Sequence, residues 1–128
     1  MNEFTVSTRY IKTTEVMKSR FIAILMPLSN ADNFKLILTD ITGEFPNAKH
    51  YVYAYRVGQK SKSCDDSEPK GTAGRPLLEL LHKRNLNNVA LVVVRYYGGI
   101  QLGAGRLLRT YVASGNNAIN IAELIELN

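Results

Sequence analysis

Hydrophobic and polar positions alternate along parts of this chain and recur at helical spacing along others. Strands are predicted where apolar and polar residues alternate or β-branched residues run together: Phe4–Tyr10, Lys18–Met26, His50–Arg56 and Val89–Val94. In His50–Arg56, the three tyrosines at 51, 53 and 55 share one face, while Val52 and Ala54 share the other. The small residues favour a face covered by helices, which would leave the tyrosines on the opposite face.

Apolar residues at helical spacing predict three helices. Their inner faces are Phe34, Ile37, Leu38 and Ile41; then Leu77, Leu80 and Leu81 after Pro76; then Leu107, Leu108, Tyr111, Val112, Ala118 and Ile119. Gly58–Gly74 reads as a long polar loop, and Ile121–Leu127 fits either a helix end or a strand. We therefore expect an α+β fold: a four-stranded mixed sheet with helices packed on one face, forming a single domain over residues 1–128 without a second domain.

Composition and charge indicate the cellular compartment and the kind of partner. The longest apolar stretch, Phe21–Leu28, is too short to cross a bilayer, and the N-terminus lacks the pattern of a secretory signal. Cys64 is the only cysteine, which fits a reducing compartment, so we expect a cytoplasmic protein without membrane association. The formal net charge is +5, and residues 49–109 hold eleven Lys and Arg against four Asp and Glu. This basic central half favours an anionic partner, although a basic surface also serves solubility.

The most informative segment is the glycine-rich turn between the predicted strand at 89–94 and the last helix. Residues 95–106 read RYYGGIQLGAGR, so a buried strand leads through glycines into a helix start. The free N–H groups and positive dipole end of such a helix bind phosphate or another oxyanion. Close packing of the turn is the competing interpretation. The candidate anion-binding residues are Lys49, His50, Arg56, Arg75, Arg95, Gly103, Ala104, Gly105, Arg106 and Arg109.

An acidic loop, residues 65–76 with the sequence DDSEPKGTAGRP, is the second candidate for chemistry. Asp65, Asp66 and Glu68 are oxygen ligands of the kind that Mg²⁺ accepts, but structural hydrogen bonds or ion pairs are the favoured use. Cys64 lies beside two carboxylates that disfavour its thiolate, and neither His50 nor His82 shows a triad or zinc spacing. We expect no catalytic residue, no metal and no cofactor. The tyrosines at 51, 53 and 55 fit cross-strand packing better than base stacking.

These motifs resemble the IMPACT/YigZ family. The signature loop, including Asp65, Asp66, Glu68, Gly71, Thr72 and Gly74, resembles one family signature, and Val94–Gly105 continuing to Tyr111 resembles another. Lys18–Ala23, His50 and Ala54–Arg56 resemble earlier landmarks in the same order. The likeness runs from about Lys18 to Tyr111.

The resemblance implies a fold like the second domain of the fifth small-subunit ribosomal protein and a link to translation. Eukaryotic members of the family regulate translation through a ribosome-associated activator of a stress kinase. This sequence departs from the family pattern at three positions: Ser67 and Arg106 replace frequent glycines, and Gln101 stands where lysine is frequent. The second domain of bacterial relatives is not part of this sequence.

The leading hypothesis is a non-enzymatic domain that binds RNA or the ribosome through phosphate contacts. An enzyme acting on a small phosphorylated substrate with magnesium is one alternative, and an adaptor that binds an acidic protein is another. The first predicts salt-dependent, weakly sequence-specific binding.

Overall fold

The computed structural model describes residues 2–127. Its elements in chain order are β1 (Phe4–Thr5), β2 (Tyr10–Val16), β3 (Ser19–Pro27), the short 3₁₀ helix η1 (Ala31–Asn33), α1 (Phe34–Glu44), β4 (His50–Val57), β5 (Lys60–Cys64), α2 (Gly74–Lys83), β6 (Val89–Tyr96), α3 (Ala104–Asn120) and β7 (Ile125–Glu126). The predicted α+β class is confirmed.

The main sheet has five strands in the order β2-β3-β6-β4-β5, and each neighbouring pair is antiparallel. The expected four-stranded mixed sheet is therefore wrong in both strand number and direction. The short strands β1 and β7 pair separately, so the uncertain segment 121–127 contributes a strand at Ile125–Glu126.

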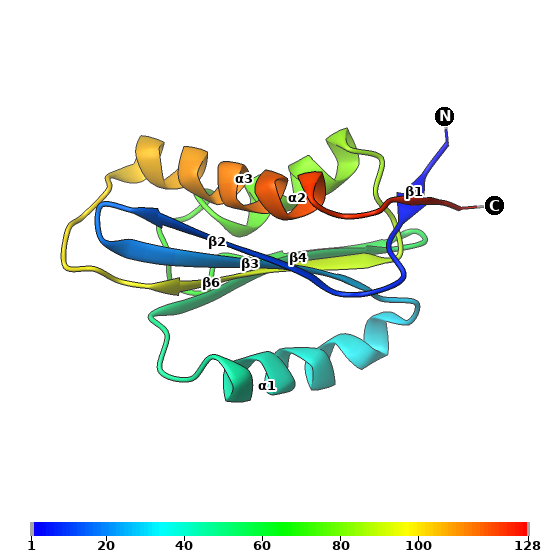
Figure 1. The fold of residues 1–128 in the computed structure, drawn as a ribbon, viewed down its shortest axis with the longest axis horizontal. Helices are drawn as coiled ribbons and strands as arrows, with labels where there is room; N and C mark the ends of the chain where they lie inside the picture. Colours follow the sequence, from blue (N-terminus) through cyan, green and yellow to red (C-terminus); the bar gives the residue numbers. More distant parts are fainter. Residues whose placement is uncertain (1, 128) are drawn as a thin grey trace.

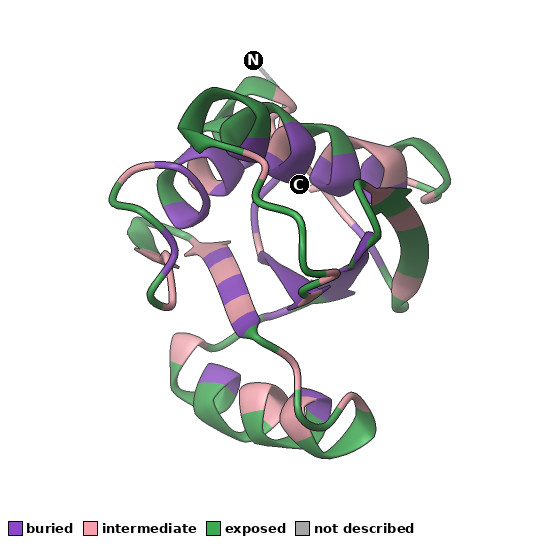
Figure 2. Cartoon of the chain, turned by 90° about the vertical axis from the view of Figure 1, so that its left-hand side faces the viewer, coloured by how far each residue is buried: buried purple, intermediate pink, exposed green. Residues whose placement is uncertain are grey.

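Helices cover both faces of the sheet. Figure 1 shows α2 and α3 on one side and α1 alone on the other, which corrects the expectation of helices on one face. The reason lies in β3 and β6, whose alternating side chains are buried on both sides. Leu91 and Val93 join the apolar core under α2 and α3, while Val92 and Val94 join a second core under α1. Figure 2 shows the buried residues in the sheet and on the sides of the helices that face it.

Two strands lie where the sequence pattern gave no sign of them. Of the strand expected at Phe4–Tyr10, only Phe4–Thr5 forms a strand, the short β1. The first strand of the main sheet is β2, which begins at Tyr10, where the expected strand ends. The expected loop Gly58–Gly74 begins with β5, the edge strand Lys60–Cys64. Both β2 and β5 lie at sheet edges, where the pairing is made by backbone groups and polar side chains remain exposed.

The tyrosines of β4 pack against α1. The ring of Phe34 lies 4.6 Å from that of Tyr53 and 5.0 Å from that of Tyr55, and the Tyr51 hydroxyl donates to the Phe45 carbonyl at 2.7 Å. Val52 and Ala54 face α2 from the other side of the sheet. The tyrosines do pack, as favoured from the sequence, but against α1 and not across neighbouring strands, because a helix covers this face as well.

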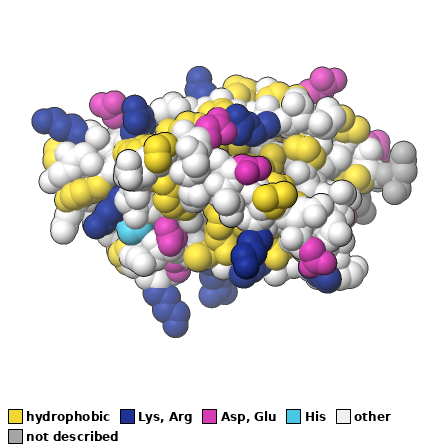
Figure 3. All heavy atoms as spheres, turned by 90° about the horizontal axis from the view of Figure 1, so that it is seen from below, with side chains coloured by type: hydrophobic (Ala, Val, Ile, Leu, Met, Phe, Trp, Pro, Cys, Tyr) yellow, Lys and Arg dark blue, Asp and Glu magenta, His cyan; other side chains and the backbone are white. Residues whose placement is uncertain are grey.

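Over residues 2–127, no helix combines the length and the apolar character needed to cross a membrane. On the face seen from the α1 side, Lys and Arg side chains are scattered and acidic side chains lie between them (Figure 3).

Candidate functional site

Three polar residues occupy one end of the sheet, on the face that α2 and α3 cover. Side chains alternate along a strand, so Arg95 follows Leu91 and Val93 onto this face. By the same alternation, His50 shares the face of Val52, and Ser19 shares the face of Phe21. His50 and Arg95 are direct cross-strand partners. The fold thereby gathers polar groups where the apolar core ends.

Glu68 is the centre of this cluster. Its side chain is 3% exposed and lies 2.7 Å from Arg95 Nη1, and Arg95 is 6% exposed. Its other oxygen, Oε1, lies 3.3 Å from His50 Nε2. Arg95 also reaches Ser19 Oγ at 3.5 Å, and its Nε has no partner within the described residues. A carboxylate in so dry a place is tolerated because charged partners compensate for the lost hydration.

His50 links the cluster to the loop that carries Glu68. Its Nδ1 lies 2.5 Å from the backbone carbonyl oxygen of Asp66, which can only accept, so Nδ1 carries the hydrogen. Its Nε2 faces the Glu68 carboxylate, which also accepts when ionised. The ring of His50 therefore connects the backbone of the signature loop with the Glu68 carboxylate.

Tyr111, from the middle of α3, completes the cluster. Its hydroxyl donates to Glu68 Oε2 at 2.5 Å, and its ring meets Phe21 edge-on at 5.3 Å. Burial raises the pKa of the Tyr111 phenol far above its ordinary value, and the hydrogen bond to Glu68 and that carboxylate's charge raise it further. The phenol thus stays protonated and serves as a fixed donor.

The other carboxylates of the signature loop shape the backbone. Asp65 accepts hydrogen bonds from the amides of Gly71, Ala73 and Gly74, at 2.9, 3.2 and 2.7 Å, and so caps the start of α2. Asp66 accepts from the amide of Tyr51 at 2.6 Å.

The same loop turns sharply and is tied internally. Glu68 N donates to Asp65 O at 3.0 Å across two residues with positive φ, as in a type I′ turn. Thr72 is buried and donates to the Pro69 carbonyl at 2.5 Å. Among residues 2–127, no three His, Cys, Asp or Glu converge as a metal site would require. The three carboxylates of the loop have structural hydrogen bonds and ion pairs, the use favoured from the sequence.

The glycine-rich turn packs against the β2–β3 hairpin. A Cβ on Gly98 would lie 2.1 Å from the Lys18 carbonyl carbon and oxygen, so only glycine fits there. The Gly98 amide donates to Ser19 Oγ at 3.1 Å. Gly103 precedes α3 with φ at +78° and ψ at 155°, a conformation that favours glycine. Within the described chain, no N-cap side chain accepts from the first amides of α3.

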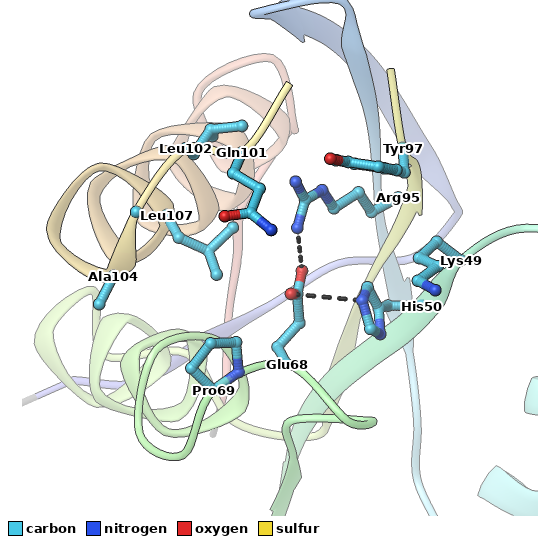
Figure 4. A pocket seen from close by; sticks show the side chains of 11 residues that line it. Lys49, His50, Glu68, Pro69, Arg95, Tyr97, Gln101, Leu102, Ala104 and Leu107 are labelled. Carbon is cyan, nitrogen blue, oxygen red and sulfur yellow. Dashed lines mark hydrogen bonds and ion pairs between the residues drawn. The ribbon is translucent and has the colours of Figure 1, made fainter. Parts of the chain in front are cut away.

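A pocket of about 370 Å³ opens between this turn, the start of α3 and the Glu68 cluster. Figure 4 shows Arg95 reaching across toward Glu68, with Tyr97 and Gln101 beside it and Ala104 on the opposite wall. The lining residues are Lys49, His50, Glu68, Pro69, Arg95, Tyr97, Gln101, Leu102, Gly103, Ala104 and Leu107. The pocket therefore joins a helix N-terminus with exposed and buried cationic groups.

The structure brings together only part of the predicted anion site. Lys49, His50, Arg95, Gly103 and Ala104 line the pocket. Three further predicted residues are exposed in the first turns of α3 and do not line the pocket: Gly105, Arg106 and Arg109.

Two predicted members lie elsewhere. Arg56 is six residues further along β4 than His50, about 20 Å away, where it pairs with Glu3 at 3.1 Å. Arg75 pairs with Glu79 at 3.3 Å on the exposed side of α2. Neither lines the pocket, so the ten predicted residues do not form one site.

Sequence reasoning did not assign a role in the site to Ser19, Tyr97 or Tyr111. A tyrosine in the apolar stripe of a helix needs a partner for its hydroxyl, and this was the available signal for Tyr111. Ser19 offered no local signal, because its partners come from β6 and the turn that follows it.

Comparisons with known proteins all point to the same family. The model of the Impact N-terminal domain matches residues 17–119. IMPACT family member YvyE of Bacillus subtilis is 41% identical over 94% of this chain and 58% of its own length. IMPACT family member YigZ of Escherichia coli is 38% identical over 82% of this chain and 54% of its own length. Human Protein IMPACT is 35% identical over 70% of this chain and 30% of its own length.

Solved structures show the same arrangement. A crystal structure of a hypothetical protein superimposes with a TM-score of 0.93 at 32% identity, covering 99% of this chain and 64% of the other. The structure of the two-domain translational regulator Yih1 matches with a TM-score of 0.50 at 21% identity, covering 93% of this chain and 47% of the other. This chain spans a little over half the length of its bacterial relatives. The family model and the bacterial relatives agree, and the chain belongs to the IMPACT family through its Impact N-terminal domain.

Proposed function

We propose that this domain binds RNA phosphates at the pocket where α3 begins, in a role connected with translation. The observation that carries the proposal is the uncapped N-terminus of α3 opening into a pocket of about 370 Å³ bordered by Lys49 and Arg95. Backbone N–H groups and a helix dipole at one wall and cations at another form a receptor for an oxyanion.

The residues have different parts in this binding. The amides of Ala104, Gly105 and Arg106 supply directional donors. Lys49, Arg106 and Arg109 supply exposed charge, and across residues 2–127 none of the three has a carboxylate within ion-pair distance. Arg95 and His50 are engaged by Glu68, so they fix the floor of the pocket and add little free charge.

The link to translation comes from relatives. Yih1, whose fold this chain shares, is described as a translational regulator, and the matched eukaryotic proteins are named Protein IMPACT. The expected likeness to the second domain of the fifth small-subunit ribosomal protein, an RNA-associated protein, stays a prediction. Phosphate contacts position RNA without reading its sequence, so the binding should be weakly sequence-specific.

The test is co-sedimentation with ribosomes and total RNA over a salt series. The variant Lys49→Ala/Arg106→Ala/Arg109→Ala removes three exposed cations beside the pocket. Its matched control, Lys12→Ala/Lys35→Ala/Lys60→Ala, removes the same charge at exposed positions on β2, α1 and β5. We expect the first variant to lose binding and the control to retain most of it. Equal losses in both variants would show that binding depends on net charge alone and not on this pocket. Absence of binding by the unmodified domain at low salt would contradict the proposal.

A further inference from the structure

Exposed apolar side chains lie on the segments next to the pocket. Tyr97 is 44% exposed, Met17 is 37% exposed and Ile100 is 36% exposed. Tyr97 lines the pocket and Ile100 lies in the turn that follows. Met17 is at the tip of the β2–β3 hairpin, and its sulfur lies 2.9 Å from Arg106 Nη1 of α3.

These segments lie at one end of the molecule. Figure 1 shows the β2–β3 turn, the loop from β6 to α3 and the segment leading into β4 at the same end. The contacts of Gly98 with Lys18 and of Met17 with Arg106 confirm that the hairpin and the start of α3 meet there. Of these residues Tyr97 and Lys49 line the pocket, and Met17, Ile100 and Arg106 lie on the segments that meet at the same end of the molecule.

Tyr97 packs against Arg95. The Arg95 guanidinium lies 5.5 Å from the centre of its ring, and Arg95 itself is fixed by the ion pair with Glu68. Within residues 2–127, Tyr97 is the only aromatic residue among the exposed large apolar side chains. An exposed aromatic ring beside cationic groups is a platform on which a nucleic-acid base can stack.

We propose that the pocket accepts single-stranded RNA, with one base stacked on Tyr97 and the adjoining phosphate at the N-terminus of α3. This inference rests on the proposed function and specifies its ligand. A base paired in a duplex does not expose its face, so the ring of Tyr97 cannot be used by double-stranded RNA. The tyrosines of β4 have no such role because α1 covers them.

The experiment measures fluorescence anisotropy of a labelled oligoadenylate of about eight nucleotides. It is compared with a duplex of equal length and with an abasic strand carrying the same phosphates. The variants are Tyr97→Leu, which removes the ring, and Tyr97→Phe, which keeps it. Leu36→Ala, at a 67% exposed position on α1, is the control for loss of an exposed apolar side chain.

We expect Tyr97→Leu to weaken binding of the oligoadenylate roughly tenfold and Tyr97→Phe by no more than about twofold. The abasic strand should bind the unmodified domain about as weakly as the oligoadenylate binds Tyr97→Leu. Salt-sensitive binding that is equal for single strand, duplex and abasic strand would overturn this inference and leave the proposed function standing. Absence of binding to every probe would overturn both.

Discussion

Glu68 and Arg95 form a buried ion pair with 2.7 Å between Oε2 and Nη1, on side chains that are 3% and 6% exposed. The pair joins the signature loop to β6, two segments that are 27 residues apart. It also places Glu68 where His50 and Tyr111 reach it. The two most distinctive motifs of the sequence therefore meet in one contact, and the pocket is built on it.

Removing one member of this pair should be costly. Arg95→Met leaves the Glu68 carboxylate buried without its main partner, and we expect the free energy of unfolding to fall by about 3–5 kcal/mol. The control is Arg75→Met, which breaks the exposed pair with Glu79 and should change the free energy of unfolding by less than about 0.5 kcal/mol. Urea denaturation of both variants measures the difference. Similar small losses in the two would show that the buried pair contributes little.

Gly98 should tolerate no side chain. The Cβ of Gly98→Ala would overlap the Lys18 backbone, so the hairpin or the glycine turn must move, at a cost of about 1–3 kcal/mol. Gly43→Ala makes the same chemical change inside α1, where the new Cβ meets nothing within 4 Å. That control should raise the free energy of unfolding by about 0.5–1 kcal/mol. Thermal denaturation shifts of opposite sign would confirm the expectation, and shifts of the same sign would contradict it.

Ser67 occupies a conformation that suits glycine. Its φ is +68°, in the sharp turn that aims Glu68 at the cluster. Ser67→Gly should stabilise the protein by about 0.5–1 kcal/mol, because the left-handed conformation is costly for a residue with a Cβ. Ser61→Gly in β5, where φ is not positive, is the matched control and should destabilise. A lower unfolding midpoint for Ser67→Gly would contradict this account of the turn.

Because Tyr111 is buried, we expect the free energy of unfolding to change at alkaline pH. Its folded-state pKa is raised above the ordinary value of 10.0, mainly by burial. Below about pH 10 the phenol is neutral in both states, so its contribution is fully present. As pH rises above about 10, the unfolded state ionises first and the contribution falls, by up to about 1.4 kcal/mol per pH unit.

Tyr111→Phe isolates this effect. The variant loses the hydrogen bond to Glu68, so it should be less stable than the unmodified domain by about 1–3 kcal/mol at neutral pH. The gap between the two should narrow between about pH 10 and 11, measured by denaturant titration at each pH. A gap that stays constant over that interval would contradict the buried, protonated phenol.

The sequence predicted the elements whose side chains repeat with a clear period. Val89–Val94 identified β6, and the stripe from Leu107 to Ile119 identified α3. The strands β2 and β5 were missed because edge strands such as Lys60–Cys64 carry polar side chains and are held by backbone hydrogen bonds. The position of α1 was missed because tyrosines on a strand fit either an open face or a covered one.

The site shows the same division between local and distant information. The glycine turn and the helix start are contiguous, so the N-terminus of α3 was identified from local sequence. The partners of Glu68 come from β4, β6 and α3, and only the register of the sheet brings them together. Arg56 was assigned to the same site as His50 because both belong to the basic part of the sequence. The extended strand β4 places them far apart, and a count of charges along the sequence does not contain that distance.

The most direct test of the central claim is an amide chemical-shift titration of the ¹⁵N-labelled domain with single-stranded RNA. The account predicts the largest shifts at Ala104, Gly105 and Arg106, with the amides of α1 unchanged, and loss of these shifts as salt is raised. Shifts centred on another surface, with the start of α3 unperturbed while RNA binds, would contradict the claim that this helix N-terminus receives the phosphate.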